Sequence, residues 1–157
     1  MFFPIFVNVN NCLVIGAGNV ALRKINKLLK YNCNITVMSK YILDDILNLY
    51  DSNKDKIKLI TREFNFNNND DLKEIEKYFL IIAATNDKDL NNKISEYCID
   101  KNILVNNISS KNNMNARFCT IIENQNYSIG ISANGKVSDA LKLKMEINKL
   151  FNDIDTN

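Results

Sequence analysis

A short apolar run that leads directly into a glycine-rich turn constrains the fold of this chain more than any other feature. Residues 12–15 read CLVI and residues 16–21 read GAGNVA. This is the G-x-G-x-x-A form of the dinucleotide-binding fingerprint, at the end of an expected strand and the start of an expected helix. Gly16 permits the tight turn, Gly18 lets a pyrophosphate approach the backbone, and Ala21 lets the helix pack closely on the strand. The N–H groups at the helix N-terminus then face the phosphates.

Along the chain as far as residue 105, apolar runs typical of strands alternate with segments whose apolar residues recur at helical spacing. The expected strands are residues 12–15, 34–38, 57–60, 79–84 and 103–105. The helices expected between them are residues 19–31, 41–50, 71–77 and 87–100. This alternation predicts a Rossmann-like, doubly wound α/β fold with a parallel sheet, and its ligand should lie at the carboxyl ends of the strands.

The pattern changes after Asn106. Two strand-like runs, residues 117–122 and 127–133, flank an expected turn, and a helix is expected from about residue 138. These elements predict a small β-hairpin followed by a helix. We therefore divide the chain into a Rossmann domain, residues 1–112, and a second segment, residues 113–157.

Composition excludes several classes of protein. The chain has 157 residues and a net charge of +2, so its charge gives no reason to expect nucleic acid or an anionic membrane as a partner. No apolar stretch approaches the roughly 20 residues that a membrane-spanning helix needs. Residues 1–7 are too short for a signal peptide and lack its basic region. We expect a cytoplasmic protein.

The chain contains no histidine. This absence excludes Ser–His and Cys–His catalytic pairs and every metal site that depends on histidine. The four cysteines lie far apart in the sequence with no C-x-x-C pair, so we expect buried, reduced thiols and no metal site. Any proton transfer must use a carboxylate, Lys, Tyr, Cys, Ser or water.

The end of the second expected strand bears on which dinucleotide is bound. A standard NAD-binding unit places an acidic residue there, but residues 37–40 read VMSK. Ser39 offers hydrogen bonds to a ribose, and Lys40 would favour the 2′-phosphate of NADP. After the fourth expected strand, Thr85 and Asn86 would either contact the nicotinamide half or help to cap the next helix. The alternative to a bound dinucleotide is a degenerate fold that keeps the glycine turn only for packing.

Several segments together resemble the amino-terminal domain family of siroheme synthase, which comprises precorrin-2 dehydrogenases, some of them also sirohydrochlorin ferrochelatases. The order and spacing of the matching segments hold over nearly the whole chain. They are FPIFV at 3–7, VIGAGNVALRK at 14–24, IIAATND at 81–87, LVN at 104–106 and IGISANGK at 129–136. The PIF segment and the VALRK segment are more specific to this family than the glycines.

The resemblance implies a homodimer that uses NAD to oxidise precorrin-2, a tetrapyrrole with eight carboxylates, to sirohydrochlorin in siroheme biosynthesis. Residues 113–157 would then build the dimer and the substrate cleft. The positions that match the family's cofactor site are Gly16, Gly18, Asn19, Val20, Met38, Ser39, Lys40, Tyr41, Ala84, Thr85 and Asn86. Arg117 and Lys136 are the candidates for binding the substrate carboxylates.

One departure from the family concerns proton transfer. The family's favoured general acid/base is an aspartate shortly after its VN motif, and aligning Asn106 places Ser109 there. A serine is a poor proton acceptor without a partner base. Ser109 is the candidate catalytic residue, but another carboxylate or water could take the proton, or the activity could be weakened. The alternatives are sirohydrochlorin ferrochelatase activity and a non-catalytic, dinucleotide-sensing Rossmann module.

Overall fold

The computed structural model describes residues 11–123 and 125–155. Its contacts divide the chain into two compact units, one ending at Ala116 and the other beginning at Arg117. We call the described residues 11–116 the Rossmann unit and residues 117–155 the hairpin unit. The FPIFV segment on which part of the family resemblance rests lies outside the described residues.

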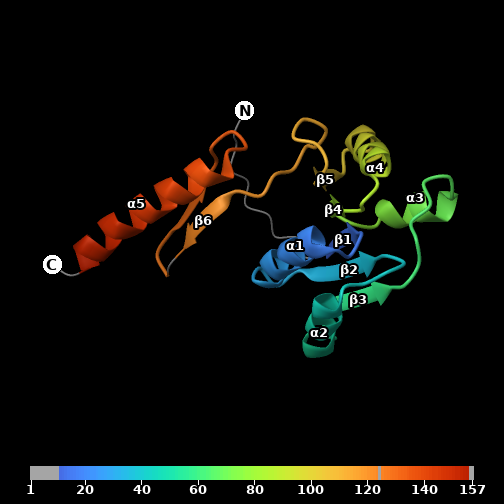
Figure 1. Cartoon of the computed structure of the whole chain (residues 1–157), viewed down its shortest axis with the longest axis horizontal. Coiled ribbons are helices and arrows are strands. Elements are labelled where there is room, and N and C mark those ends of the chain that lie inside the picture. The colour runs from blue at the N-terminus through green and yellow to red at the C-terminus, as the bar shows by residue number, and fades with distance from the viewer. Residues whose placement is uncertain (1–10, 124, 156–157) are drawn as a thin grey trace. The chain divides into compact units, whose positions relative to one another are not determined.

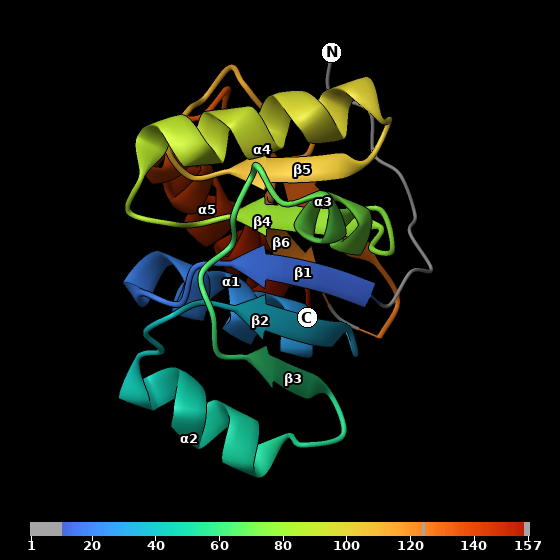
Figure 2. The same cartoon turned by 90° about the vertical axis from the view of Figure 1, so that its right-hand side faces the viewer.

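The Rossmann unit is a five-stranded parallel sheet between helices (Figures 1 and 2). Its strands are β1 (Asn11–Ile15), β2 (Asn34–Met38), β3 (Ile57–Ile60), β4 (Leu80–Ala83) and β5 (Leu104–Asn107). Its helices are α1 (Asn19–Leu29), α2 (Asp44–Ser52), α3 (Asn69–Ile75) and α4 (Lys88–Asp100). The predicted Rossmann-like α/β fold is therefore confirmed.

Strand order creates a crevice at one edge of this sheet. The order is β3-β2-β1-β4-β5, so the chain first moves from β1 to one side and later returns to place β4 on the other side of β1. Connections that leave in opposite directions from neighbouring strands separate at the carboxyl ends of those strands. The topology therefore places the crevice at the carboxyl ends of β1 and β4, next to the glycine turn.

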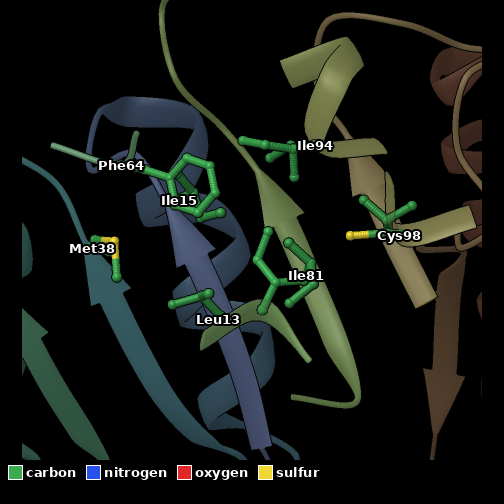
Figure 3. Close-up of a cluster of buried hydrophobic side chains, with 10 residues drawn as sticks. Leu13, Ile15, Met38, Phe64, Ile81, Ile94 and Cys98 are labelled. Atoms are coloured by element: carbon green, nitrogen blue, oxygen red, sulfur yellow. The ribbon is translucent and has the colours of Figure 1, made fainter. Parts of the chain in front are cut away.

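The core follows from the alternation of side chains along each strand. Leu13 and Ile15 of β1 and Ile81 of β4 point to the face that packs on Ile94 of α4, and all four are fully buried. Figure 3 shows these side chains with Met38, Phe64 and Cys98 in one cluster, on the face of the sheet away from α1. Burying each large aliphatic side chain contributes about 1.5–3 kcal/mol. This core holds the strand ends, and hence the crevice, in a fixed arrangement.

The hairpin unit is a smaller assembly of two strands and one helix (Figure 1). Strands β6 (Thr120–Glu123) and β7 (Ser128–Ile131) pair in antiparallel fashion, and α5 (Val137–Asp155) packs against them. The side chains of Ile122, Ile131 and Ala140 are buried together. The predicted hairpin and helix are confirmed, although each strand is shorter than predicted and the helix continues to Asp155.

One further boundary differs from the prediction in a way that affects the site. Helix α2 begins at Asp44 instead of residue 41. The Leu43 N–H donates to the Ala17 carbonyl at 3.1 Å, which ties this segment to the glycine turn. Residues 41–43 thus pass beside the crevice before the helix starts. No helix among the described residues has the length and apolar character needed to cross a membrane.

Candidate functional site

Gly16 forms the turn that joins β1 to α1. Its φ of +104° lies in the region that side chains strongly disfavour, and its N–H donates to the Met38 carbonyl at 2.9 Å. A Cβ at this position would collide with the backbone carbonyl of Ala84. Only glycine therefore lets β1 and β4 come together at the mouth of the crevice.

Gly18 has a different reason to be glycine. It is the N-cap of α1, and a Cβ placed on it would have no neighbouring atom within 4 Å, so its bare backbone faces open space. Helix α1 has no side-chain cap and no acidic residue in its first turn, whereas Asp87 caps α4 with its carboxylate. The first N–H groups of α1 therefore carry the positive end of the helix dipole without an internal anion to satisfy it.

A cavity of about 520 Å³ lies in front of this helix terminus, over the carboxyl ends of β1, β2 and β4. The predicted cofactor residues other than Val20 all line it. They are Gly16, Gly18, Asn19, Met38, Ser39, Lys40, Tyr41, Ala84, Thr85 and Asn86. Val20 lies in the first turn of α1 and is not part of the cavity wall.

The connection that follows β2 forms one end of the cavity. The Ser39 hydroxyl donates to the Tyr41 carbonyl at 2.8 Å, so its oxygen remains available only as an acceptor. The Lys40 ammonium lies 5.4 Å from the centroid of the Tyr41 ring, and both side chains are exposed. This end of the cavity therefore presents a cation and an aromatic face where a standard NAD site has a carboxylate.

The loop between β3 and α3 adds wall residues that the sequence analysis did not select. Glu63 and Phe64 line the cavity, and Phe64 is also buried in the core. The fully buried Asp71 anchors this loop, because its Oδ2 accepts the Asn65 N–H at 2.7 Å and its Oδ1 lies 2.5 Å from the Arg62 guanidinium. No local sequence pattern points to these residues, since the loop reaches the cavity only after the sheet has formed.

Electrostatics at Asp71 support this anchoring role. Burial alone would favour the neutral acid, but the Arg62 guanidinium and the Asn65 N–H stabilise the carboxylate and lower the pKa of Asp71 below its ordinary value. The carboxylate is therefore ionised at neutral pH and holds the loop through charge-assisted contacts.

Residues 85–87 follow β4, and they both cap α4 and line the cavity. The Asp87 carboxylate caps α4 by accepting the N–H groups of Asp89 at 2.9 Å and Leu90 at 3.0 Å. Thr85 and Asn86 lie in the cavity wall, and Asp87 also lines it. Capping and cavity lining therefore occur together in three consecutive residues.

Ser109 does not line the cavity, although hydrogen bonds connect it to the cavity wall. Its Oγ accepts from Asn91 Nδ2 at 2.7 Å, and Asn91 Oδ1 accepts the Thr85 N–H at 3.0 Å. The sequence analysis missed Asn91. Its spacing could have pointed to it, because Asn91 lies on the same buried face of α4 as three other residues. A polar side chain on a buried face needs a hydrogen-bond partner. The other buried residues of this face are Ile94, Ser95 and Cys98.

Arg117 and Lys136 lie together in the hairpin unit. Both line a cavity of about 80 Å³ at the start of α5, beside Gly135, whose φ is +85°. Two cations next to a helix N-terminus favour an anionic ligand. The hairpin unit therefore brings these two candidate substrate-binding residues to the same small cavity.

No cysteine lines the larger cavity, whereas Cys119 lines the small cavity of the hairpin unit. Cys12, Cys33 and Cys98 are buried free thiols, as predicted, but Cys119 is only partly buried. Burial raises the pKa of Cys98 to about 12, and burial together with the neighbouring Cys33 raises the pKa of Cys12 to about 12. Both thiols stay protonated and are poor nucleophiles. Within the described ranges, no three Cys, Asp or Glu side chains gather in a way that could hold a metal ion.

Comparison with known proteins places the chain in a family. Residues 5–120 match the model of NAD_binding_7, a family of NAD(P)-binding domains. The chain belongs to this family.

The chain is also similar to siroheme synthases. It is 34% identical to the siroheme synthase of Buchnera aphidicola over 148 residues, which are 92% of this chain and 29% of that protein. It is 35% identical to the siroheme synthase of Vesicomyosocius okutanii over 137 residues, which are 86% of this chain and 28% of that protein. The chain thus spans less than a third of the length of these relatives. The resemblance to the siroheme synthase family is confirmed.

A solved structure has a similar fold. The structure of SirC, precorrin-2 dehydrogenase, matches with a TM-score of 0.74 and covers 94% of this chain and 70% of SirC. Its sequence identity of 21% makes this a likeness of fold.

The residues of the cavity fit the ligand of the NAD_binding_7 family. A Cβ on Gly18 would fill the space in front of the α1 N-terminus, where a pyrophosphate has to approach. The uncapped N–H groups and the absence of an acid in the first turn of α1 suit an anion. Lys40 adds a cation to the same cavity.

Proposed function

We propose that this protein is an NAD-dependent precorrin-2 dehydrogenase, which forms sirohydrochlorin in siroheme biosynthesis. The observation that carries the proposal is the uncapped, acid-free N-terminus of α1 beside Gly18, in a cavity whose wall holds the residues that match the family's cofactor site. The siroheme synthase relatives and the SirC fold supply the substrate class.

In this proposal, three parts of the cavity wall bind three parts of the cofactor. Gly18 and Asn19 would hold the pyrophosphate at the start of α1. Residues 38–41 would hold the adenosine end, where the Ser39 oxygen is free to accept a ribose hydroxyl. Ala84, Thr85 and Asn86 would lie against the nicotinamide end. When bound, NAD accepts the hydride that leaves the substrate.

The substrate brings eight negative charges that need compensation. In this proposal Arg117 and Lys136 bind substrate carboxylates at the start of α5. The macrocycle loses a hydride to the cofactor and a proton to another carboxylate or to water, because among the described residues Ser109 has no hydrogen bond to a base that would make it a proton acceptor. The protein therefore contributes orientation and charge, and the cofactor contributes the redox step.

The proposal includes a homodimer formed through the hairpin unit, which would be the dimerisation and substrate-cleft segment. Helix α5 leaves a series of large apolar side chains exposed to solvent, from 45% to 67%. They are Val137, Leu141, Leu143, Met145 and Leu150. Val137, Leu141 and Met145 recur at every fourth residue and so share one side of α5. A second copy of the chain would cover this side, because exposed apolar patches mark association sites.

The test is an assay of the purified protein with precorrin-2 and NAD, which follows NADH formation and the absorption spectrum of sirohydrochlorin. We expect both to rise together. Gly18→Ala should abolish NAD binding while the fold persists, because the added methyl group enters open space. NAD binding without any turnover would rule out the dehydrogenase and favour the dinucleotide-sensing module.

A ferrochelatase activity on sirohydrochlorin is the remaining alternative within the family, and a second assay tests it. Incubation with sirohydrochlorin and Fe²⁺ in the absence of NAD would then yield siroheme. Ser109→Asp tests the proton step, because gain of dehydrogenase activity in this variant would show that position 109 limits the chemistry.

A further inference from the structure

Asn91 is a fully buried polar residue whose amide has all its hydrogen bonds made inside the protein. Its Oδ1 accepts from the Thr85 N–H at 3.0 Å and from the Thr85 hydroxyl at 2.8 Å. Its Nδ2 donates to the Thr85 carbonyl at 2.9 Å and to the Ser109 hydroxyl at 2.7 Å. Two donors and two acceptor sites are the whole capacity of this side chain.

The backbone of Thr85 determines which way this amide points. A backbone N–H only donates and a carbonyl only accepts, so Oδ1 must face the Thr85 N–H and Nδ2 must face the Thr85 carbonyl. The second N–H of Nδ2 is then directed at Ser109. A flipped amide would break both contacts with Thr85 inside the protein, at a cost of about 1–3 kcal/mol for each unsatisfied group.

The loop that carries Ser109 is held from a second direction. The Ser109 N–H donates to Asn107 Oδ1 at 2.8 Å, and Asn107 Nδ2 donates to Asn92 Oδ1 at 2.9 Å. Asn107 is itself buried at the end of β5. Both the backbone and the hydroxyl of Ser109 are therefore fixed relative to the first turn of α4 and to Thr85 in the cavity wall.

This geometry decides which role the serine hydroxyl has. The Asn91 N–H occupies a lone pair of Ser109 Oγ, so the hydroxyl proton is directed elsewhere. Among the described residues no group accepts this proton from the half-buried Ser109. We propose that Asn91 is a positioning residue that holds Ser109 as a hydrogen-bond donor to a carboxylate of the bound substrate.

The proposal rests on the proposed dehydrogenase function, and its first test is a double-mutant cycle. Asn91→Asp keeps the acceptor oxygen and removes both N–H donors. We expect Ser109→Ala to lower kcat/KM for precorrin-2 about tenfold, mainly through a higher KM, because one charge-assisted hydrogen bond to the bound substrate is lost. The Kd for NAD should change less than about twofold. Asn91→Asp should lower kcat/KM by a similar factor in the wild-type background and add little once Ser109→Ala is present.

Asn48→Asp is the control, since it makes the same chemical change at an exposed position of α2, outside the hydrogen bonds that hold Ser109. It should leave kcat/KM unchanged. If Asn91→Asp costs as much in the Ser109→Ala background as in the wild type, Asn91 does not act through Ser109 and the proposal is wrong.

A second measurement needs no turnover and remains valid if an Asn91 variant fails to fold. In ¹H–¹⁵N spectra, Ser109→Ala should move one of the two Nδ2 proton resonances of Asn91 upfield, because that proton loses its acceptor. Ser110→Ala, in the same loop, should leave both resonances in place. Unchanged Asn91 resonances in Ser109→Ala would overturn the proposal. A wild-type protein without turnover whose resonances behave as expected would refute the dehydrogenase function and retain the Asn91–Ser109 contact.

Discussion

The Rossmann unit and the hairpin unit differ in how completely they bury their large apolar side chains. In the Rossmann unit, side chains such as Leu13, Ile81 and Ile94 are fully enclosed between the sheet and its helices. In the hairpin unit only a small cluster is buried, while Val137 on α5 is 67% exposed and Leu150 is 63% exposed. One unit encloses its large apolar side chains within the chain, and the other leaves several of them exposed.

The same contrast applies to polar groups. The Rossmann unit buries amides and a carboxylate in specific hydrogen bonds, including Asn91 and Asp71, so its site geometry is determined internally. The hairpin unit places its cations, Arg117 and Lys136, around a small cavity at the start of a helix. The polar side chains of the Rossmann unit are thus held by buried contacts, whereas the two cations of the hairpin unit border a small cavity.

The largest expected effect is that of Gly16→Ala on the Rossmann unit. The added methyl group would collide with the Ala84 carbonyl at a positive φ, so we expect the free energy of unfolding to fall by at least about 3 kcal/mol. Gly18→Ala is the control, with a change below about 1 kcal/mol. Denaturant unfolding followed by circular dichroism measures both. Equal stability of the two variants would contradict this account of the turn.

The second prediction compares the two cores directly. Ile81→Ala removes a fully buried side chain from the sheet and should cost about 2–5 kcal/mol. Ile131→Ala, at 6% exposure in the small cluster, should cost about half as much, because fewer neighbours surround the cavity it leaves. Urea titrations of the two variants provide the values. If Ile131→Ala were the more costly, the hairpin unit would be the better packed of the two.

The third prediction concerns pH and the loop that Asp71 anchors. The folded-state pKa of Asp71 is lowered, so its contribution is complete above the unfolded value of about 4 and is lost as the pH falls through the folded value. Asp71→Asn should cost about 1–3 kcal/mol at neutral pH and flatten the acid limb of the stability profile. Asp51→Asn, in an exposed pair with Lys54, should cost less than about 0.5 kcal/mol. An unchanged acid limb in Asp71→Asn would assign the acid sensitivity to other carboxyl groups.

The smallest effect on stability is expected for charges placed on the exposed face of α5. Leu141→Asp combined with Met145→Asp should change the free energy of unfolding by less than about 0.5 kcal/mol. The same pair of changes should convert a dimer to a monomer in light scattering. Leu47→Asp, on the exposed side of α2, is the control and should leave the mass unchanged. A dimer that survives the double variant would place the interface elsewhere.

Most residues that the sequence predicted for the cofactor site line one cavity in the structure. The fingerprint located the turn, and the segments after β2 and β4 located two walls of the cavity. The loop residues Glu63 and Phe64 were missed because they reach the cavity from β3, a strand that does not adjoin β1. The start of α2 was misplaced because residues 41–43 are held by a backbone contact with Ala17 that no helical period reveals.

The sequence by itself determined the order of strands and helices, the glycine turn and the class of ligand, because these depend on periodicity and on residues adjacent in the chain. Tertiary structure decided the strand order, the anchoring of the β3–α3 loop and the contact between Asn91 and Ser109. These features join residues that are distant in the chain, and only the packing of the sheet against its helices brings them within hydrogen-bonding distance. The glycine turn thus marks where a dinucleotide should bind, and the packed sheet determines which side chains surround it.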